Sequence, residues 1–400
     1  MTGVQTCALP ISDVVIVGGG GVGSSIAYHL TARPDFKGSV VVVERDPAYA
    51  TASTALSAGG VRQQFSTQEN IQLSLYGAHF IRDLGRLLEV DGDKPNINFI
   101  EGGYLFLATP SGVPVLEANH ALQKSEGADN TLLDARALKA RFPWMTTDGL
   151  ALGSLGLSME GWFDPYGLLQ ALKRKARAQG VRYITDTVVG LERSGDRLDA
   201  VKLASGGRLA GRWIVNAAGP HAGKLAAMAG LDLPVVPKKR FVYVFDCRED
   251  LKPRVPLLID PSGVWVRPEG AGYIGGISPP EDQDPDCEDL EVSYDLWEEI
   301  VWPTLAERVP AFEAVKLQRA WAGHYDYNTL DQNGIIGAHP DVPNFLLANG
   351  FSGHGIQQAP ATGRAIAELI CDGRFTSIDL ARFGYERIRE GRPLIELNVV

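Results

Sequence analysis

A glycine-rich turn between a buried strand and a helix constrains this chain more than any other feature of its sequence. Val14–Val17 is a continuous β-branched run, typical of a parallel strand buried on both faces. Gly18, Gly20 and Gly23 follow it, and a helical stretch then leads to a second run, Val40–Val43. A strand, a helix and a parallel strand in this order form a βαβ unit. The sequence therefore predicts an α/β fold with a dinucleotide-binding fingerprint.

The residues of this fingerprint have separate mechanical roles. Gly18 permits the tight turn, Gly20 lets a pyrophosphate approach the backbone, and Gly23 lets the helix pack on the strand. The N-terminus of the helix carries partial positive charge, which attracts a diphosphate. Glu44 ends the second strand 21 residues after Gly23, and we expect it to accept hydrogen bonds from the adenosine ribose. A glycine-rich turn beside a surface glutamate is the alternative.

Length and composition exclude several classes of protein. The 400 residues are 45% hydrophobic and 22% charged, which suits roughly two or three globular domains. No apolar run approaches the roughly 18 residues of a membrane span. Lys and Arg total 38 against 48 Asp and Glu, a net charge of -10, so we expect no nucleic-acid partner. The four cysteines lack metal-ligand spacing, which predicts no metal site and no disulfide framework.

A second glycine cluster, near the far end of the chain, favours FAD over NAD. Asn349–Gln358 reads NGFSGHGIQQ, between a predicted strand and a predicted helix, so its N–H groups can face a second part of the same ligand. Positive partial charge beside the pyrimidine edge of an isoalloxazine stabilises the anionic reduced flavin. A nicotinamide enzyme instead continues with alternating strands and helices into a separate catalytic domain. A helix cap without a chemical role is the alternative.

The rest of the chain alternates between two kinds of strand. Runs typical of parallel strands return at Val181–Thr185 and Arg212–Gly219. An alternating strand pattern, as in an antiparallel sheet with one covered face, occurs in Arg240–Phe245, Val264–Pro268 and Tyr273–Ile277. We therefore expect two interleaved domains, with the cofactor bound by residues 12–85, 160–235 and 320–400 and the substrate by residues 86–159 and 236–319. Residues 1–11 resemble a translated sequencing adaptor, and we expect them to be non-native.

Several strings carry a family resemblance. Glu44–Arg62, Val215–Gly219 and Gly350–Gly355, in this order after the fingerprint, resemble the D-amino-acid oxidase and sarcosine oxidase superfamily of flavoproteins. The resemblance implies a glutathione-reductase-type Rossmann domain for FAD and an interleaved substrate domain whose antiparallel or mixed sheet covers the flavin. It also implies hydride removal from a carbon that bears an amine. Longer strings resemble a mitochondrial flavoprotein implicated in the assembly of respiratory complex I.

The resemblance extends the set of residues expected at the cofactor. The residues expected to bind FAD are Gly18, Gly20, Gly21, Val22, Gly23, Glu44, Arg45, Ser53, Ser57, Ala58, Gly59, Val188, Ala218, Gly219, Gly353, His354, Gly355, Ile356 and Gln357. Trp321–Asn328, near which related enzymes link the flavin to a cysteine, contains none. We therefore expect non-covalent FAD.

The substrate side departs from the family pattern. Arg62 lies where sarcosine oxidases hold the substrate carboxylate, a task that suits a bidentate and permanently charged guanidinium. Gln357 replaces a lysine of sarcosine oxidases, and Tyr325 replaces an arginine of glycine and D-amino-acid oxidases. The remaining candidate catalytic residues are Arg267 and His354. For each candidate an ordinary structural role is the alternative: a salt bridge for Arg62, an edge-strand position for Arg267, and core packing for Tyr325 and His354.

The sequence thus predicts an FAD-dependent amine oxidase or dehydrogenase. We expect it to remove hydride from the CH–NH group of a small, sarcosine-like N-substituted amino acid and to pass electrons to oxygen or to a carrier. Two alternatives stay open: a flavin-bearing assembly factor for respiratory complex I with little turnover, and a 2-hydroxy-acid dehydrogenase, which needs a base for the hydroxyl proton. The expected location is the cytoplasm, with a peripheral position at the inner membrane as the alternative.

Overall fold

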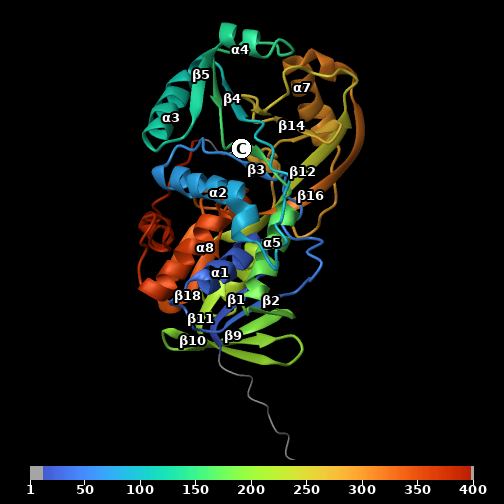
Figure 1. Ribbon diagram of the computed structural model, residues 1–400. Coiled ribbons are helices and arrows are strands. Elements are labelled where there is room, and N and C mark those ends of the chain that lie inside the picture. Colours follow the sequence, from blue (N-terminus) through green and yellow to red (C-terminus); the bar gives the residue numbers. More distant parts are fainter. Residues whose placement is uncertain (1–11, 398–400) are drawn as a thin grey trace, which may run out of the picture.

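Two eight-stranded sheets organise the part of the chain that the structure describes, residues 12–397. In the computed structural model, the first sheet lies in the lower half of Figure 1 and most of the second in the upper half. The predicted α/β fold with an antiparallel second domain is confirmed. The expectation that residues 1–11 are non-native lies outside the described residues.

The first sheet is built around the strand that precedes the fingerprint. Its main path, in spatial order, is β17 (Ile335–His339), β18 (Val342–Asn349), β11 (Arg208–Asn216), β1 (Ser12–Val17), β2 (Val40–Glu44) and β8 (Arg182–Thr185). From β18 to β8 all neighbours are parallel, as the continuous valine runs predict. An unpredicted antiparallel hairpin of β9 (Val188–Ser194) and β10 (Arg197–Leu203) pairs with β11.

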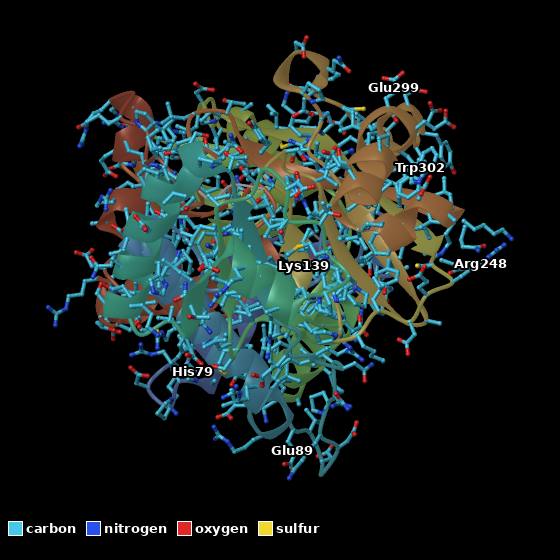
Figure 2. The ribbon with its side chains drawn as sticks, turned by 90° about the horizontal axis from the view of Figure 1, so that it is seen from above. His79, Glu89, Lys139, Arg248, Glu299 and Trp302 are labelled. Carbon is cyan, nitrogen blue, oxygen red and sulfur yellow. The ribbon has the colours of Figure 1, made fainter. Side chains whose placement is uncertain are left out.

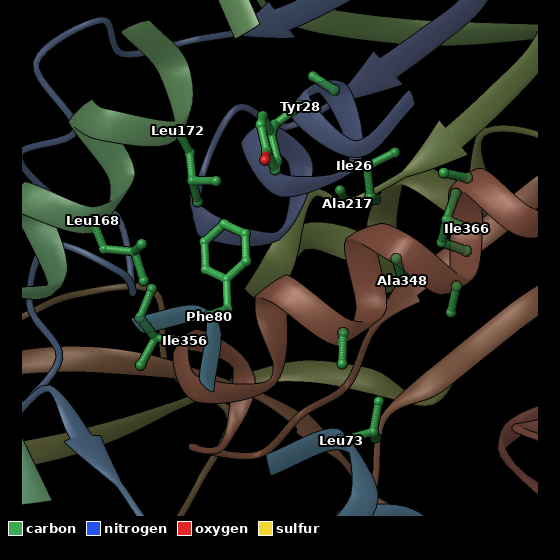
Figure 3. Packing of buried hydrophobic residues seen from close by; sticks show 14 of the residues in the cluster. Ile26, Tyr28, Leu73, Phe80, Leu168, Leu172, Ala217, Ala348, Ile356 and Ile366 are labelled. Atoms are coloured by element: carbon green, nitrogen blue, oxygen red, sulfur yellow. The ribbon is translucent and has the colours of Figure 1, made fainter. Parts of the chain in front are cut away.

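Both faces of this sheet are covered. Val14 and Ile16 pack with the helices α1 (Gly21–Ala32), α2 (Gln68–Leu87), α5 (Pro165–Ala178) and α8 (Gly355–Asp372). Figure 3 shows side chains of these helices, among them Tyr28, Phe80 and Leu172, gathered into one core. The alternate residues of β1 face the hairpin and the short helix α6 (Ala222–Ala227). Burial of both faces explains why β1 has no polar side chain between Val14 and Val17.

The second sheet is mostly antiparallel. Its strands, in spatial order, are β16 (Lys316–Asn328), β12 (Val235–Asp246), β15 (Gly272–Gly276), β14 (Trp265–Glu269), β13 (Leu257–Ile259), β4 (Tyr104–Ala108), β6 (Leu152–Gly156) and β5 (Asn130–Asp134). The helices α3 (Val113–Ser125), α4 (Ala135–Arg141) and α7 (Trp302–Arg308) lie around it in Figure 1. Seen from above, Arg248, Glu299 and Glu89 project from the rim of the molecule (Figure 2). A two-stranded ladder, β3 (Gly60–Val61) with β7 (Gly161–Trp162), joins the two halves.

The predicted division of the chain differs from the sheets at one point. A boundary at residue 320 falls inside β16, which stays paired with β12 as far as Asn328. The chain therefore returns to the first sheet only at β17. The division into domains itself stays a prediction. Within residues 12–397, no helix combines the length and the hydropathy that crossing a membrane requires.

Candidate active site

A cavity of about 430 Å³ lies between the two sheets and brings together most of the predicted site residues. Those that line it are Gly18, Gly20, Gly21, Val22, Glu44, Arg45, Ser53, Ser57, Ala58, Arg62, Val188, Ala218, Gly219, Tyr325, Gly353, His354, Gly355, Ile356 and Gln357. Gly23, Gly59 and Arg267 do not line it. The cavity thus connects both glycine clusters, which are more than 300 residues apart in the chain.

The fingerprint glycines meet different surroundings. Gly18 has a φ of 101°, and a Cβ there would lie 2.2 Å from the carbonyl oxygen of Ala217. A Cβ on Gly23 would lie 1.9 Å from the carbonyl oxygen of Gly18, so this glycine is required for packing of α1 on β1. A Cβ on Gly20 would meet only Thr54, at 3.5 Å. Gly20 therefore borders the cavity, and Gly23 the protein interior.

The residues around Gly20 fit a diphosphate. Gly20 is the N-cap of α1, and the first turn of the helix contains no acidic residue. The N–H of Gly21 donates to the hydroxyl of Thr54 at 3.1 Å. Within the described chain, the buried hydroxyl of Ser53 has no hydrogen-bond partner. A helix N-terminus free of anionic side chains, with a spare hydroxyl donor beside it, is a site for phosphate oxygens.

Glu44 already holds the backbone of the fingerprint. Its carboxylate accepts hydrogen bonds from the N–H of Gly19, at 2.8 Å, and from the N–H of Asp46, at 2.9 Å. A carboxylate has about four acceptor sites, so two remain for the ribose hydroxyls that the sequence predicts. Glu44 therefore both shapes the loop and borders the cavity.

A buried aspartate organises the second glycine cluster. The carboxylate of Asp326 accepts hydrogen bonds from the N–H groups of Gly350, at 2.8 Å, and Phe351, at 3.2 Å. Burial raises the pKa of Asp326 to about 6. Asp326 lines the cavity and was missed in the sequence analysis. The sequence feature that could have indicated Asp326 is its position next to the predicted site residue Tyr325.

Arg62 is a buried cation in the cavity wall. It is 2% exposed, and its guanidinium lies 4.0 Å from the centre of the Phe65 ring. Its Nη1 donates to the carbonyl oxygen of Gln64 at 2.6 Å, and its Nη2 lies 3.1 Å from Nε2 of His354. Burial lowers the pKa of Arg62, which still leaves a guanidinium charged at neutral pH.

His354 is neutral in this arrangement. Because Arg62 can only donate, Nε2 of His354 accepts and Nδ1 carries the proton. Burial, followed by the charge of Arg62, lowers the pKa of His354 from 6.5 to about 3. The imidazole therefore orients Arg62 and is a weak base. His354 also precedes α8 as its N-cap residue.

Tyr325 and Gln357 lie close to this pair. Tyr325 packs so closely on Gly353 that a Cβ there would lie 2.4 Å from the tyrosine ring. The side-chain oxygen of Gln357 accepts a hydrogen bond from the backbone N–H of Arg62 at 2.8 Å. The candidates Arg62, His354, Tyr325 and Gln357 thus meet at the start of α8.

Arg267 has a different position. Its guanidinium donates to the carbonyl oxygen of Ala58, at 2.6 and 3.1 Å, and to that of Pro268, at 2.8 Å. It also pairs with Glu269. These bonds place Arg267 behind the loop that carries Ser57 and Ala58, where it supports the cavity wall. Its predicted pairing with a substrate carboxylate stays a prediction.

The inner face of the second sheet supplies cavity residues that the sequence analysis left out. Among them are Tyr104, Leu257, Ile259, Trp265 and Arg240. Alternation along each strand puts them on one face, but which strands lie side by side depends on the tertiary fold. The residues on β4 and β13 form an apolar wall, and Arg240 on β12 adds a cation.

The chain is similar to known proteins along nearly its whole length. A family described as FAD dependent oxidoreductase matches residues 13–369. FAD-dependent oxidoreductase domain-containing protein 1 of Xenopus laevis is 47% identical over 423 residues, covering 97% of this chain and 85% of that protein. Mitochondrial sarcosine dehydrogenase of Mus musculus is 25% identical over 401 residues, covering 93% of this chain and 41% of that protein.

The solved structures give the same result for the fold. L-proline dehydrogenase from P. horikoshii superposes with a TM-score of 0.85 at 26% identity, covering 96% of this chain and 100% of that one. The predicted resemblance to the D-amino-acid oxidase and sarcosine oxidase superfamily is confirmed.

Proposed function

The chain belongs to the FAD dependent oxidoreductase family, and from that premise we propose that it oxidises the CH–NH group of a small N-substituted amino acid. It is an oxidoreductase whose cofactor is FAD. The proposed reaction removes a hydride from carbon, the nitrogen lone pair forms a C=N bond, and the N–H proton of the resulting iminium passes to water. Water then adds to the imine and releases an amine and a carbonyl compound.

FAD supplies the hydride acceptor for this reaction. The residues that would hold its diphosphate are Gly20 and Ser53, with Glu44 at the ribose. The N-terminus of α8 after His354 would face the flavin with positive partial charge. A neutral His354 preserves this arrangement, because it leaves Arg62 and the helix end as the positive groups there.

The observation that carries the proposal is the meeting of Arg62, His354 and Tyr325 in the cavity that also contains the fingerprint. A buried guanidinium beside a dinucleotide site suits an acid whose reacting carbon must be held in a fixed orientation. Mitochondrial sarcosine dehydrogenase, by its name, acts on an N-methyl amino acid, and its similarity to this chain points to the same substrate class.

A 2-hydroxy acid is a less suitable substrate. Its oxidation needs a base for the hydroxyl proton, and a histidine with a pKa of about 3 is poorly suited to that task. A neutral secondary amine can lose hydride without such a base, because its nitrogen lone pair forms the new bond. The assembly-factor alternative predicts bound FAD without turnover.

The test is an anaerobic visible spectrum of the holoenzyme, recorded with sarcosine, proline, D-amino acids and 2-hydroxy acids. We expect N-substituted amino acids to bleach the flavin band and the 2-hydroxy acids to leave it unchanged. Arg62→Gln should slow bleaching, whereas Arg319→Gln, an exposed arginine of the second sheet, should not. Flavin that no amine bleaches would contradict the proposal, and recovery in air separates an oxidase from a dehydrogenase.

A further inference from the structure

Arg240 is a second buried cation of the cavity that contains Arg62. It lies on β12, is 9% exposed and lines the cavity. Its guanidinium lies 5.0 Å from the centre of the Tyr325 ring. Burial raises the pKa of Tyr325, and the charges of Arg240 and Arg62 both oppose that rise. Tyr325 therefore lies in contact with Arg240, in the same cavity wall as Arg62.

The counter-ion of Arg240 comes from a loop. Asp284 accepts hydrogen bonds from Nη1 and Nη2 of Arg240, at 2.8 and 2.9 Å. Both side chains are about nine-tenths buried. This bidentate geometry is also the one in which a guanidinium binds the carboxylate of a ligand. The carboxylate of Asp284 thus occupies the position of a ligand carboxylate.

Asp284 belongs to an acidic strap, residues 279–291, which follows β15, lies along β12 at the Lys238–Asp286 bridge and reaches α6 through Glu288. The strap is held elsewhere by separate ion pairs: Asp286 with Lys238 at 3.4 Å, Asp289 with Lys239 at 2.6 Å, and Glu288 with Lys224 at 2.6 Å. The residues on either side of Asp284 are exposed. Release of Asp284 therefore requires only a local change, while the other contacts keep the strap in place.

The pairing with Asp284 leaves Arg240 incompletely satisfied. Within the described residues, the buried Nε of Arg240 has no hydrogen-bond partner. A buried donor without an acceptor is unfavourable. A carboxylate that is not attached to the strap can bond Nε together with Nη2, which gives Nε an acceptor and takes Nη2 from Asp284. A ligand can therefore compete with Asp284 for this cation.

We propose that the substrate is a secondary amine with two carboxylates, and that the second carboxylate binds Arg240 in place of Asp284. The inference rests on the proposed function, in which Arg62 holds the first carboxylate. Two guanidinium groups of one cavity then balance two carboxylates. A substrate with one carboxylate leaves the Arg240–Asp284 ion pair intact. Arg240 is thus a residue that determines specificity.

Two redox-inert thioethers test the proposal: (methylthio)acetate, with one carboxylate, and thiodiacetate, with two. Perturbation of the flavin spectrum of the holoenzyme gives the dissociation constant of each. One additional charge-assisted hydrogen bond predicts binding of thiodiacetate that is about tenfold tighter. In Arg240→Gln the two constants should become similar. In Asp284→Asn thiodiacetate should bind tighter still, because its competitor has lost its charge.

Hydrogen exchange of the strap gives an independent readout. Thiodiacetate should accelerate amide exchange near Asp284, and (methylthio)acetate should not. Arg319→Gln and Asp286→Asn are the matched controls, since the first is an exposed arginine of the same sheet and the second a neighbouring strap aspartate that pairs with Lys238. Both should keep the wild-type preference. If Arg240→Gln does not fold, Asp284→Asn and the exchange data decide the question.

The outcomes separate this proposal from the proposed function. If (methylthio)acetate binds as well as thiodiacetate, or the strap exchanges at the same rate with both, the second carboxylate site is wrong and the oxidation of an N-substituted amino acid stands. An unchanged preference in Arg240→Gln also overturns the proposal. If neither thioether perturbs the flavin and no amine bleaches it, both proposals are wrong.

Discussion

Gly20 and Gly23 belong to one fingerprint, yet the structure predicts different consequences for the same substitution. Gly23→Ala places a Cβ 1.9 Å from a backbone oxygen, and overpacking of this kind costs about 1–3 kcal/mol or more of unfolding free energy. Gly20→Ala meets open space apart from Thr54, so the apoprotein should keep its stability and lose FAD affinity. Urea unfolding of both apoproteins, with FAD titration of whichever folds, measures the difference. Equal loss of stability in the two variants would contradict these assignments.

Glu160 provides a residue-scale prediction about pH. It is 1% exposed and accepts hydrogen bonds from the N–H of Gln63 and the side chain of Gln64. Burial raises its pKa from 4.5 to about 7. Between these values the folded protein binds the proton more strongly than the unfolded chain does. The contribution of Glu160 to stability is therefore complete below about pH 4.5 and is lost as pH rises through 7.

The corresponding variant is Glu160→Gln, which cannot ionise. Its unfolding free energy relative to wild type should rise between pH 4.5 and 8, by an amount on the order of 3 kcal/mol for a shift of this size. Urea unfolding at several pH values measures the change. Glu117→Gln, at an exposed position of α3, is the control and should follow the wild type. A difference that does not vary with pH would rule out a buried, protonated Glu160.

At the scale of elements, a buried ion pair attaches the C-terminal segment to the turn after β16. Arg387, on α9 (Glu386–Arg389), contacts Asp331 at 2.7 Å, and both side chains are almost fully buried. Arg387→Ala would leave the carboxylate of Asp331 buried without its cation, which costs about 3–5 kcal/mol. Thermal unfolding should show a large loss of stability. Arg392→Ala removes an exposed pair with Glu390 and should change stability by less than about 1 kcal/mol.

The elements also show where sequence reasoning succeeded. The strands β1, β2, β8, β11 and β18 and the helices α1 and α8 lie where the sequence patterns predict them, because those patterns report burial directly. The hairpin of β9 and β10 was missed. The predicted domain boundary at residue 320 also divided β16 between the two domains, because the pattern of a strand does not identify the sheet to which it belongs.

At the scale of the whole molecule, FAD should stabilise the protein by mass action. A ligand that binds only the folded state adds about 2.7 kcal/mol at 100 times its dissociation constant, so the melting temperature should rise with FAD concentration. FMN, which lacks the adenosine part that Glu44 would bind, should produce a smaller shift. We also expect acid precipitation to release the flavin into the supernatant. Flavin that stays with the pellet would contradict non-covalent binding.

The sequence by itself determined the features that depend on neighbouring residues. The valine runs, the fingerprint from Gly18 to Gly23 and the cluster after Asn349 are local patterns, and each is read from residues that touch one another along the chain. They were sufficient for the α/β fold, the cofactor and the family. Arg62 could be proposed because the string that contains it resembles a family.

Only the tertiary structure decided which distant side chains share the cavity. Arg240 meets Tyr325 and Asp284 because β12 pairs with β16 and the acidic strap folds back over it. Arg267 supports the loop at Ala58, a contact across 209 positions of sequence. Such contacts are set by strand order and by long connections. The pattern of a single strand contains no information about either, so the substrate site could be predicted only in part.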